Sequence, residues 1–477
     1  MKKYFWHPFL IFGGALLLLL VVARFIPAWN TSLLAFKKLD VVQRIADSFT
    51  PSKADSLRKI ADEMHIASAQ TPLAGFRAKL AEQKKNPSGS IRIAYFGDSI
   101  IEGDLISGKL REQFQLNYGG SGVGLVPITS IVNEFRRTVK HSFSRNWETL
   151  SFMKRGAGKP ALGMIGYTFI PRSYYYEETV IELAPTPVEP VLADSLGNPL
   201  EPVPEQPVET KTELRRYYVD GPSWVEYAGV RHSGGAADFR HVRLFYSHAS
   251  SGSYVRVSQD GGDFATYNLT PGEGVQVLSL SPSVPLKKVR FEFSPADPLH
   301  LYGVSFDEPA GVFVDNLSVR GFSGLNFSAI PAGVLSAFQR QLDYDLVILQ
   351  YGENVSRADI RDYSFYKKGM LASVRHIQSA LPGVPILLIS AHDRSVKHEG
   401  QYITSPDIPL LVNAQGEVAL ETGSAFWNLF DAMGGLGSMP SFVNASPPLA
   451  GRDYTHFTIA GANKIAGMLF GFLTAGK

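Results

Sequence analysis

Cysteine is absent from all 477 residues of this chain. The protein therefore has no disulfide bonds, no thiolate metal ligands and no cysteine nucleophile. An excess of one charge is lacking as well, because 46 Lys and Arg residues face 44 Asp and Glu residues, for a formal net charge of +2. No Lys/Arg-rich cluster alternates with aromatic residues, so the sequence gives a nucleic-acid partner no electrostatic support.

The sequence also lacks the motifs in which metal ligands or nucleotide-binding residues stand at characteristic spacings. The histidines are scattered, and no His-Glu-x-x-His segment occurs. The glycine-rich run over residues 119–124 follows a predicted helix and lacks the Lys-Ser/Thr pair with which phosphate loops reach phosphate and metal. We therefore predict neither a metal nor another cofactor, and interpret the run as a tight loop near the functional site.

The N-terminus contains one long uncharged segment. Lys2 and Lys3 precede residues 8–23, which carry no charge and include a run of leucines, and extension to Trp29 approaches the roughly 20 residues that cross a bilayer. A cleaved signal peptide is the alternative, but no small-x-small site follows the run. We expect residues 1–29 to form an uncleaved signal anchor, a single transmembrane helix. The globular part would then be extracytoplasmic, and periplasmic if the source is Gram-negative.

The rest of the chain changes character twice. An apolar fraction of 45% and a charged fraction of 19% are typical of a globular protein. Residues 30–90 show helical spacing of apolar positions, which predicts a helical lead-in or stalk. Residues 130–310 contain short strand-like runs bounded by turn residues such as Asp260-Gly261-Gly262. This pattern predicts an inserted all-β domain, a sandwich or jelly roll.

Strands alternate with helices over residues 91–129 and 311–477. The apolar runs at 91–96, 345–350 and 384–389 read as buried strands, and residues 459–473 read as a closing helix. We therefore predict an α/β core with a parallel sheet covered by helices on both faces. Ligands of such sheets bind at the carboxyl ends of the strands. Small or polar residues follow the runs there, at 97–99, 321–324, 352–354 and 391–393.

Three residues, one at such a strand end and two on a turn near the C-terminus, suit acyl transfer. The hydroxyl of Ser99 is a weak nucleophile until a base takes its proton, and the base works best when a third group orients it. Asp453 and His456 lie three residues apart, so both can project from one turn. The alternative is that Asp453 caps that turn and His456 is a polar surface residue. We interpret Asp98 as a structural group that hydrogen-bonds the turn presenting Ser99.

A second histidine and aspartate compete with this pair. His392 and Asp393 are adjacent on a predicted strand end, so their side chains point to opposite faces and make poor partners for one another. Either could still contact substrate.

The spacing of these motifs resembles that of the SGNH (GDSL-type) hydrolases. The resemblance covers Gly97-Asp98-Ser99, a glycine for the second block, Gly352-x-Asn354 and Asp453-x-x-His456, in the family's order. It implies a three-layer, flavodoxin-like core in which Ser99 is the nucleophile, His456 the base and Asp453 its orienting carboxylate. It also implies an oxyanion hole made by the N–H groups of Ser99 and Gly324 (or Gly321) and the amide of Asn354. Val355 stands where many members have Asp.

The predicted function is a serine esterase that removes small acyl groups, in particular acetyl, from extracytoplasmic carbohydrate. An SGNH core interrupted by a carbohydrate-binding-like β domain resembles the architecture of peptidoglycan O-acetylesterases. Two alternatives stay open: an O-acetyltransferase with the same triad, and a non-catalytic envelope protein that binds glycan. Several aromatic residues could stack on sugar rings or simply pack the core, namely Tyr174, Tyr175, Tyr176, Trp224, Tyr227, Phe245 and Tyr246.

Overall fold

The computed structural model describes residues 72–154, 160–182, 210–230, 238–297 and 299–475. The predicted anchor at 1–29 and most of the predicted lead-in lie outside these residues. Within them, no helix is long and apolar enough to cross a bilayer. The chain divides into two units, Met1–Glu63 and Met64–Lys477, and everything described below belongs to the second.

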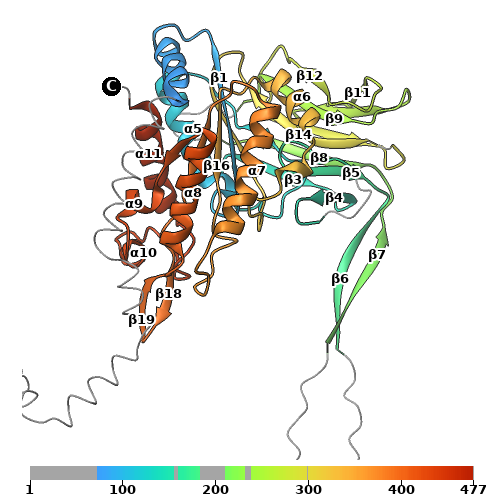
Figure 1. Cartoon of the computed structure of the whole chain (residues 1–477). Coiled ribbons are helices and arrows are strands. Elements are labelled where there is room, and N and C mark those ends of the chain that lie inside the picture. The colour runs from blue at the N-terminus through green and yellow to red at the C-terminus, as the bar shows by residue number, and fades with distance from the viewer. Residues whose placement is uncertain (1–71, 155–159, 183–209, 231–237, 298, 476–477) are drawn as a thin grey trace, which may run out of the picture. The chain divides into compact units, whose positions relative to one another are not determined.

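A parallel sheet with the strand order β15-β1-β16-β17-β20 forms the core (Figure 1). Its strands are β1 (Ser90–Gly97), β15 (Gly311–Ser318), β16 (Leu346–Gln350), β17 (Ile386–Ile389) and β20 (Ala425–Trp427). Counted along the chain, these strands have the order 2-1-3-4-5 of flavodoxin-like sheets, with a topological switch point beside β1. The parallel sheet predicted from the apolar runs is therefore confirmed.

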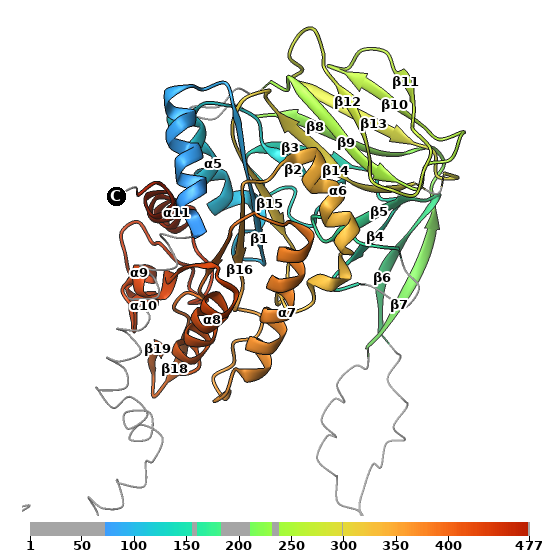
Figure 2. The ribbon, with the colours of Figure 1, turned by 45° about the horizontal axis from the view of Figure 1, so that its top comes forward.

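Helices cover both faces of this sheet, since successive residues of β1 point to opposite sides. Ile93 and Tyr95 pack with one group of helices, whereas Ala94 and Phe96 pack with the other. The first group comprises the helix over residues 72–85, α5 (Leu105–Tyr118) and α11 (Ile459–Thr474). The second comprises α6 (Ala332–Leu342), α7 (Ser364–Ala380) and α8 (Ile408–Thr422), and Figure 2 shows both groups. Short helical turns are η1 (Glu102–Asp104), η2 (Phe327–Ala329), α9 (Leu429–Met433) and α10 (Ser438–Val443).

Two antiparallel sheets face each other between β1 and β15 in the sequence, with an apolar core between them. One contains β11 (Ala265–Asn268), β10 (Tyr254–Gln259), β13 (Lys288–Phe293), β8 (Ser223–Gly229) and β3 (Val139–Phe143). The other contains β12 (Gln276–Leu280), β9 (His241–Ser247), β14 (His300–Asp307), β5 (Tyr167–Pro171) and β4 (Trp147–Ser151), with β2 (Gly124–Val126) beside β14. This arrangement is a β-sandwich. The predicted turn at 260–262 joins β10 to β11, with Asp260 and Gly261 at positive φ.

Two hairpins stand apart from these sheets. One is the long ribbon of β6 (Tyr174–Glu182) and β7 (Thr210–Tyr218), visible in Figure 1 beside β4 and β5. The other is the short pair β18 (Ser395–His398) and β19 (Gln401–Thr404), which lies near α10.

A buried arginine joins the sandwich to the parallel sheet. Arg92 of β1 donates to both oxygens of Asp315 on β15 at 2.8 Å and to Asp307 at the end of β14 at 3.0 Å. Burial by itself lowers the pKa of Arg92, but the two carboxylates outweigh burial and raise it. Removing Arg92 would leave the buried carboxylate of Asp315 without its ion pair, which typically costs about 3–5 kcal/mol. This cluster holds the two parts of the fold in register.

The glycine-rich run at 119–124 lies at the amino ends of the parallel strands, whereas we expected it near the functional site at their carboxyl ends. Gly119 accepts a hydrogen bond from the N–H of Val312, and a Cβ on Gly120 would lie 2.9 Å from the Cα of Gly311, at the start of β15. The reason is the length of α5, whose 14 residues span about 20 Å and return the chain to the amino ends of the strands. The expectation of a loop near the functional site is therefore wrong, and the glycines serve close backbone packing.

Candidate active site

Ser99 lies two residues beyond the end of β1, at the switch point of the sheet. Gly97 pairs with Ser318 of β15 on one side and Gln350 of β16 on the other, so the chain leaves the sheet between two carboxyl ends. The next residue, Asp98, is 1% exposed and accepts the N–H of Ile100 at 3.0 Å. This hydrogen bond fixes the turn that presents Ser99, the structural role that the sequence suggested for Asp98.

His456 is presented by a closed loop before α11. Ala450 and Phe457 form an antiparallel bridge at its base, and Gly451 donates to the carbonyl of His456 at 2.8 Å. The chain reverses at Tyr454, which has a φ of 54°. At the start of α11, a Cβ on Gly461 would lie 1.8 Å from the carbonyl oxygen of Leu449, so only glycine permits this approach. The loop therefore has little freedom to move its histidine.

The structure brings Ser99, His456 and Asp453 into one hydrogen-bonded chain. The Oγ of Ser99 lies 3.2 Å from Nε2 of His456, and Nδ1 of His456 lies 2.7 Å from Oδ2 of Asp453. The other oxygen, Oδ1, accepts the backbone N–H groups of His456 and Thr455 at 3.1 and 3.2 Å. Partial burial raises the pKa of Asp453, but the hydrogen bonds from His456 and Thr455 outweigh it and lower the pKa below its usual value.

An ionised Asp453 holds the proton of His456 on Nδ1. Nε2 is then the unprotonated nitrogen, and it faces the hydroxyl of Ser99 at hydrogen-bond distance. This is the tautomer that a general base needs if it is to take the serine proton. The predicted roles of these three residues are thus geometrically possible, and they stay predictions until activity is measured.

The predicted oxyanion donors are arranged less simply. Nδ2 of Asn354 donates to Oδ2 of Asp98 at 2.9 Å and to the carbonyl of Phe322 at 3.2 Å, so both amide protons are engaged within the protein. Within the described residues, the N–H groups of Ser99 and Gly324 have no hydrogen-bond partner. Gly324 has a φ of +81°, and a Cβ there would lie 2.7 Å from the ring of Tyr351.

The loop at 321–324 therefore lies against Asn354. The N–H groups of Ser99 and Gly324 are available to a ligand, whereas the side-chain amide of Asn354 is already hydrogen-bonded within the protein. Gly321 also has a positive φ, but a Cβ there meets only the flexible end of Met153 at 3.5 Å. Close packing thus distinguishes Gly324 from Gly321, although it does not assign the donor. The oxyanion roles of Ser99, Gly324 and Asn354 stay predictions.

His392 and Asp393 point apart, as expected for adjacent residues at a strand end. Asp393 accepts the N–H of Met439 at 2.6 Å. His392 is 1% exposed, and its Nε2 lies 2.8 Å from the carbonyl of Thr455, next to the candidate base. Burial lowers the pKa of His392 to about 4. His392 therefore supports the loop that carries His456 and does not itself reach the surface.

Glu353 is the residue of this region that sequence reasoning missed. Its Oε1 lies 3.1 Å from Nδ1 of His392, and its side chain is 8% exposed. Burial raises the pKa of Glu353 to about 8, against the opposing effects of Arg394 and His456. The sequence did contain one signal: Glu353 closely follows the apolar run at 345–350, in a region expected to be buried, where a charged side chain is costly.

Burial is the main reason that the pKa of Glu353 is raised, because neither carboxyl oxygen has a hydrogen-bond partner among the described residues, although Oε1 lies close to Nδ1 of His392. His392 donates from Nε2 to the carbonyl of Thr455, so its Nδ1 carries a lone pair that faces Glu353. A carboxylate at that place would face a lone pair, whereas a carboxylic acid can donate its proton to Nδ1. Glu353 and His392 thus lie behind Thr455, one residue before His456.

We expect Glu353→Gln to change how stability depends on pH. Between the ordinary glutamate pKa of 4.5 and about 8, the folded protein holds a proton that the unfolded chain has released, so the wild-type protein loses stability as the pH rises. Glutamine keeps a donor for His392 without titrating. As the pH rises, the free energy of unfolding of the variant should therefore increase relative to that of the wild type, by up to about 1.4 kcal/mol per pH unit.

Urea unfolding at intervals between pH 5 and pH 8 measures this difference. Glu134→Gln, at an exposed glutamate, is the control and should parallel the wild type. Parallel curves for Glu353→Gln and wild type would show that Glu353 is ionised in the folded protein.

No group of three or more His, Asp or Glu side chains in the described part of the chain is placed to hold a metal ion.

Comparison with known proteins gives one informative likeness. No family model matches the sequence, and no curated protein matches it. A solved structure titled "Peptidoglycan O-acetylesterase in action, 5 min" is similar over 85% of this chain and 96% of that chain, at 21% identity and a TM-score of 0.60. This likeness supports the expected fold, an α/β core with a parallel sheet and additional antiparallel sheets, and at this identity it shows the fold alone.

Two carbohydrate esterases of family 2 are also similar, at much lower scores. The one from Corynascus thermopiles (Myceliophthora fergusii), solved with its carbohydrate-binding domain, is 13% identical over 53% of this chain and 94% of that chain, with a TM-score of 0.26. The one from Cellvibrio japonicus is 12% identical over 53% of this chain and 89% of that chain, with a TM-score of 0.23. Scores this low say nothing further about this chain.

Proposed function

We propose that this protein is a serine esterase that removes acetyl groups from O-acetylated carbohydrate through an acyl-enzyme. The observation that carries the proposal is the chain from Ser99 through His456 to Asp453, with spacings of 3.2 and 2.7 Å, at the switch point of the sheet. The solved structure of like fold is described as a peptidoglycan O-acetylesterase, which supports a carbohydrate ester as substrate.

Acylation begins when Nε2 of His456 takes the hydroxyl proton as Oγ of Ser99 attacks the ester carbonyl. Asp453 stabilises the imidazolium that forms, since its carboxylate stays ionised beside Nδ1. Negative charge develops on the carbonyl oxygen, and the N–H groups of Ser99 and Gly324, which have no hydrogen-bond partner within the described residues, are the donors that we assign to it. Each such donor is worth about a hundredfold to a thousandfold in rate.

Asn354 joins this set only if its amide leaves Asp98 or Phe322. Burial raises the pKa of Asp98 to about 7, while the hydrogen bonds from Ile100 and Asn354 lower it. Protonation of Asp98 would weaken its hold on the Asn354 amide, which is strongest on an ionised carboxylate. The amide could then turn to the substrate oxygen.

Collapse of the tetrahedral intermediate completes the first half-reaction. The C–O bond to the sugar breaks, the sugar oxygen takes the proton from Nε2 of His456, and the acetyl group stays on Ser99. Water then gives a proton to the same nitrogen and attacks the acetyl carbonyl. When the bond from that carbonyl to Oγ breaks, Nε2 returns the proton to Oγ of Ser99, and acetic acid leaves and ionises to acetate. A sugar hydroxyl in place of this water would make the reaction an acetyl transfer.

The fate of a labelled acetyl group decides between hydrolysis and transfer. We expect the full-length protein, given glycan with carbon-14-labelled O-acetyl groups and an unlabelled acceptor glycan, to release the label as free acetate. Label recovered only on the acceptor would identify a transferase. A Ser99→Ala preparation supplies the background for both products.

The site of action is proposed to be outside the cytoplasmic membrane, with the protein held by its N-terminal segment. The basis is the uncharged run at 8–23 behind Lys2 and Lys3. Protease added to spheroplasts should digest the globular part, and full protection would place it in the cytoplasm.

A further inference from the structure

The ribbon of β6 and β7 has a strand edge to which no other strand is bonded. Its two strands are nine residues long and form a sheet of their own, with no third strand in the described part of the chain. A two-stranded sheet is only marginally stable in water, whereas three or more strands with an apolar face are stable. The length of this ribbon therefore favours a further strand beside it.

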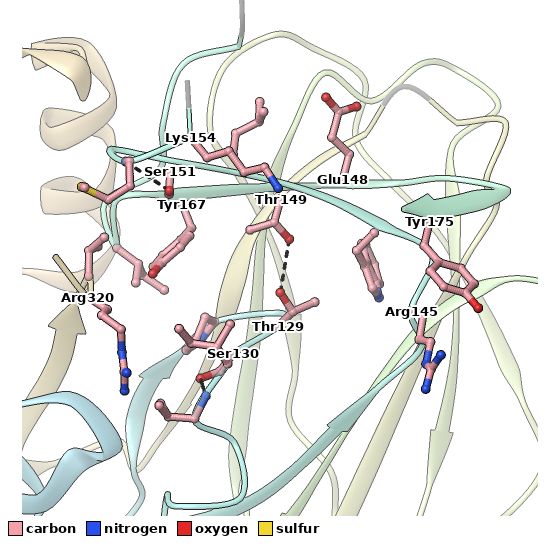
Figure 3. Close-up of a pocket in the computed structure, with 18 of the residues that line it drawn as sticks. Thr129, Ser130, Arg145, Glu148, Thr149, Ser151, Lys154, Tyr167, Tyr175 and Arg320 are labelled. Carbon is pink, nitrogen blue, oxygen red and sulfur yellow. Dashed lines mark hydrogen bonds between the residues drawn. The ribbon is translucent and has the colours of Figure 1, made fainter. Parts of the chain in front are cut away.

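The free edge belongs to β7, because β6 faces the body of the protein. β6 lies against β4 at its base, and Figures 1 and 2 both show β7 on the side of the ribbon away from β4. A cavity of about 1270 Å³ lies between β6 and the sandwich, and Tyr174, Tyr175 and Tyr176 help to line it. Figure 3 shows Tyr175 there beside Arg145, whose guanidinium lies 5.6 Å from the ring centre. A further strand would therefore add along β7.

Large side chains of β7 are exposed. The exposed fractions are 60% for Leu214 and 73% for Tyr218. By contrast, three aromatic residues that the sequence offered for stacking on sugars are at most 1% exposed and pack in the core, namely Tyr227, Phe245 and Tyr246. Large apolar groups gathered on an exposed surface are typical of interaction sites.

The hydrogen-bond pattern of the ribbon shows which backbone groups of β7 point outward. The N–H of Val219 donates to the carbonyl of Ser173 at 2.8 Å, and the register of the two strands is unbroken. Residues of an antiparallel pair alternate between bonding across the ladder and pointing away from it. The N–H and C=O groups of Leu214 and Arg216 therefore point away from β6. β7 contains no proline, so none of these donors is missing.

The charges of β7 are complementary to those of a second copy of the same strand. Charged residues usually protect an edge strand, because the like charges of two copies repel each other. Antiparallel pairing about a two-fold axis at Leu214 instead places Glu213 of each copy directly opposite Arg215 of the other. The same axis brings the outward N–H and C=O groups of the two Leu214 residues together, as an antiparallel ladder requires. An axis at Glu213, Arg215 or Arg216 would place a charge opposite itself.

The ribbon already contains part of this charge pattern. Arg215 lies directly opposite Glu177 of β6 and 3.9 Å from Glu213 of its own strand. Glu177 in turn pairs with Arg145 at 2.6 Å. In a sheet made by two copies, Arg215 would lie between Glu177 of its own copy and Glu213 of the other. Opposite charges directly across from each other stabilise such a sheet.

We propose that two copies of this protein associate through β7, whose free edges pair antiparallel about a two-fold axis at Leu214 to form a four-stranded sheet. The interface is isologous, since both copies contribute the same strand. The proposal does not depend on the esterase function, and its test uses no turnover.

Disulfide cross-linking of the full-length protein tests the register. The chain has no cysteine, so an introduced one can pair only with its copy. Directly opposite residues of a hydrogen-bonded pair have Cα atoms about 5.5 Å apart, within the roughly 4.4–6.8 Å that a disulfide spans. Oxidation should therefore convert most of Leu214→Cys to a covalent dimer, seen on a non-reducing gel.

Tyr218→Cys is the matched control on the same strand. Tyr218 is the more exposed of the two residues, but in the proposed register it lies opposite Thr210 of the other copy. The two copies of Tyr218 would then be about 27 Å apart along the strands, too far for a disulfide. Cross-linking of Leu214→Cys no greater than that of Tyr218→Cys overturns the proposal.

Charge reversal tests the pairing without a covalent bond. In sedimentation velocity of the full-length protein in non-ionic detergent, Arg215→Glu and Glu213→Arg should each weaken association at least about tenfold, because each sets like charges across the two-fold axis. A mixture of the two variants should associate again, since every Glu then faces an Arg of the other copy. Within each variant the charges at 213 and 215 stay alike, so this recovery can come only from pairing between copies.

Arg256→Glu is the control for charge reversal. Arg256 is also an exposed arginine paired with a glutamate, Glu292 at 3.2 Å, but it lies on β10 of the sandwich. Its reversal should leave association unchanged, and thermal melting checks that each variant is folded. A mixture that stays monomeric, or single variants that associate as strongly as the wild type, would refute pairing through β7.

Discussion

Alanine at position 99 should lower the turnover of 4-nitrophenyl acetate by about three orders of magnitude or more. The substitution removes only Oγ, whose hydrogen-bond partner is Nε2 of His456 at 3.2 Å. Because that oxygen forms the acyl-enzyme, no other atom at the site can replace it, and the residual rate should be that of the remaining donors alone. Initial rates of the full-length wild type and variant at neutral pH measure the effect.

Ser251→Ala is the matched control for this experiment. Ser251 is an exposed serine in a turn of the sandwich, and its substitution should leave the rate unchanged. Equally slow hydrolysis by wild type and Ser99→Ala would remove the basis of the esterase function and favour a glycan-binding protein without catalysis.

Loss of the imidazole of His456 should cost about a thousandfold or more, close to the loss from Ser99→Ala. Without Nε2, the serine proton has no acceptor and the leaving sugar has no proton donor. Combining the two substitutions should cost little more than either does singly, because the two groups act as a unit. A double-mutant cycle, which compares the rates of the wild type, His456→Ala, Ser99→Ala and the double variant, measures how strongly the two residues depend on each other.

His398→Ala supplies the matched control, since His398 is an exposed histidine on β18. Its substitution should leave the rate unchanged. Additive losses in the double variant would instead show that Ser99 and His456 act independently, and would contradict the roles assigned to them.

Local chemistry determined much of the fold in advance. The apolar runs at 91–96 and 345–350 predicted β1 and β16 because a strand buried on both faces must be apolar throughout. The closing helix predicted over 459–473 is α11, which the side chain of Thr458 caps by accepting the N–H of Gly461. These signals lie within a few residues, so they can be read without knowledge of the rest of the chain.

Longer-range features could not be read in this way. The glycine run at 119–124 gave no sign of which sheet edge it would reach, because that depends on the length and direction of α5. Glu353 gave no sign that His392, from another strand, would face it. The commitment of the Asn354 amide to Asp98 was equally hidden, since the two residues are 256 positions apart.

The sequence by itself determined which groups could do chemistry, namely a serine after a buried strand and an aspartate and histidine spaced to share one turn. Tertiary structure alone decided that Nε2 of His456 faces Oγ of Ser99 across 357 positions of chain. The physical reason is that hydrogen-bond geometry over a few residues is fixed locally, whereas distances between remote residues depend on how sheets and helices pack.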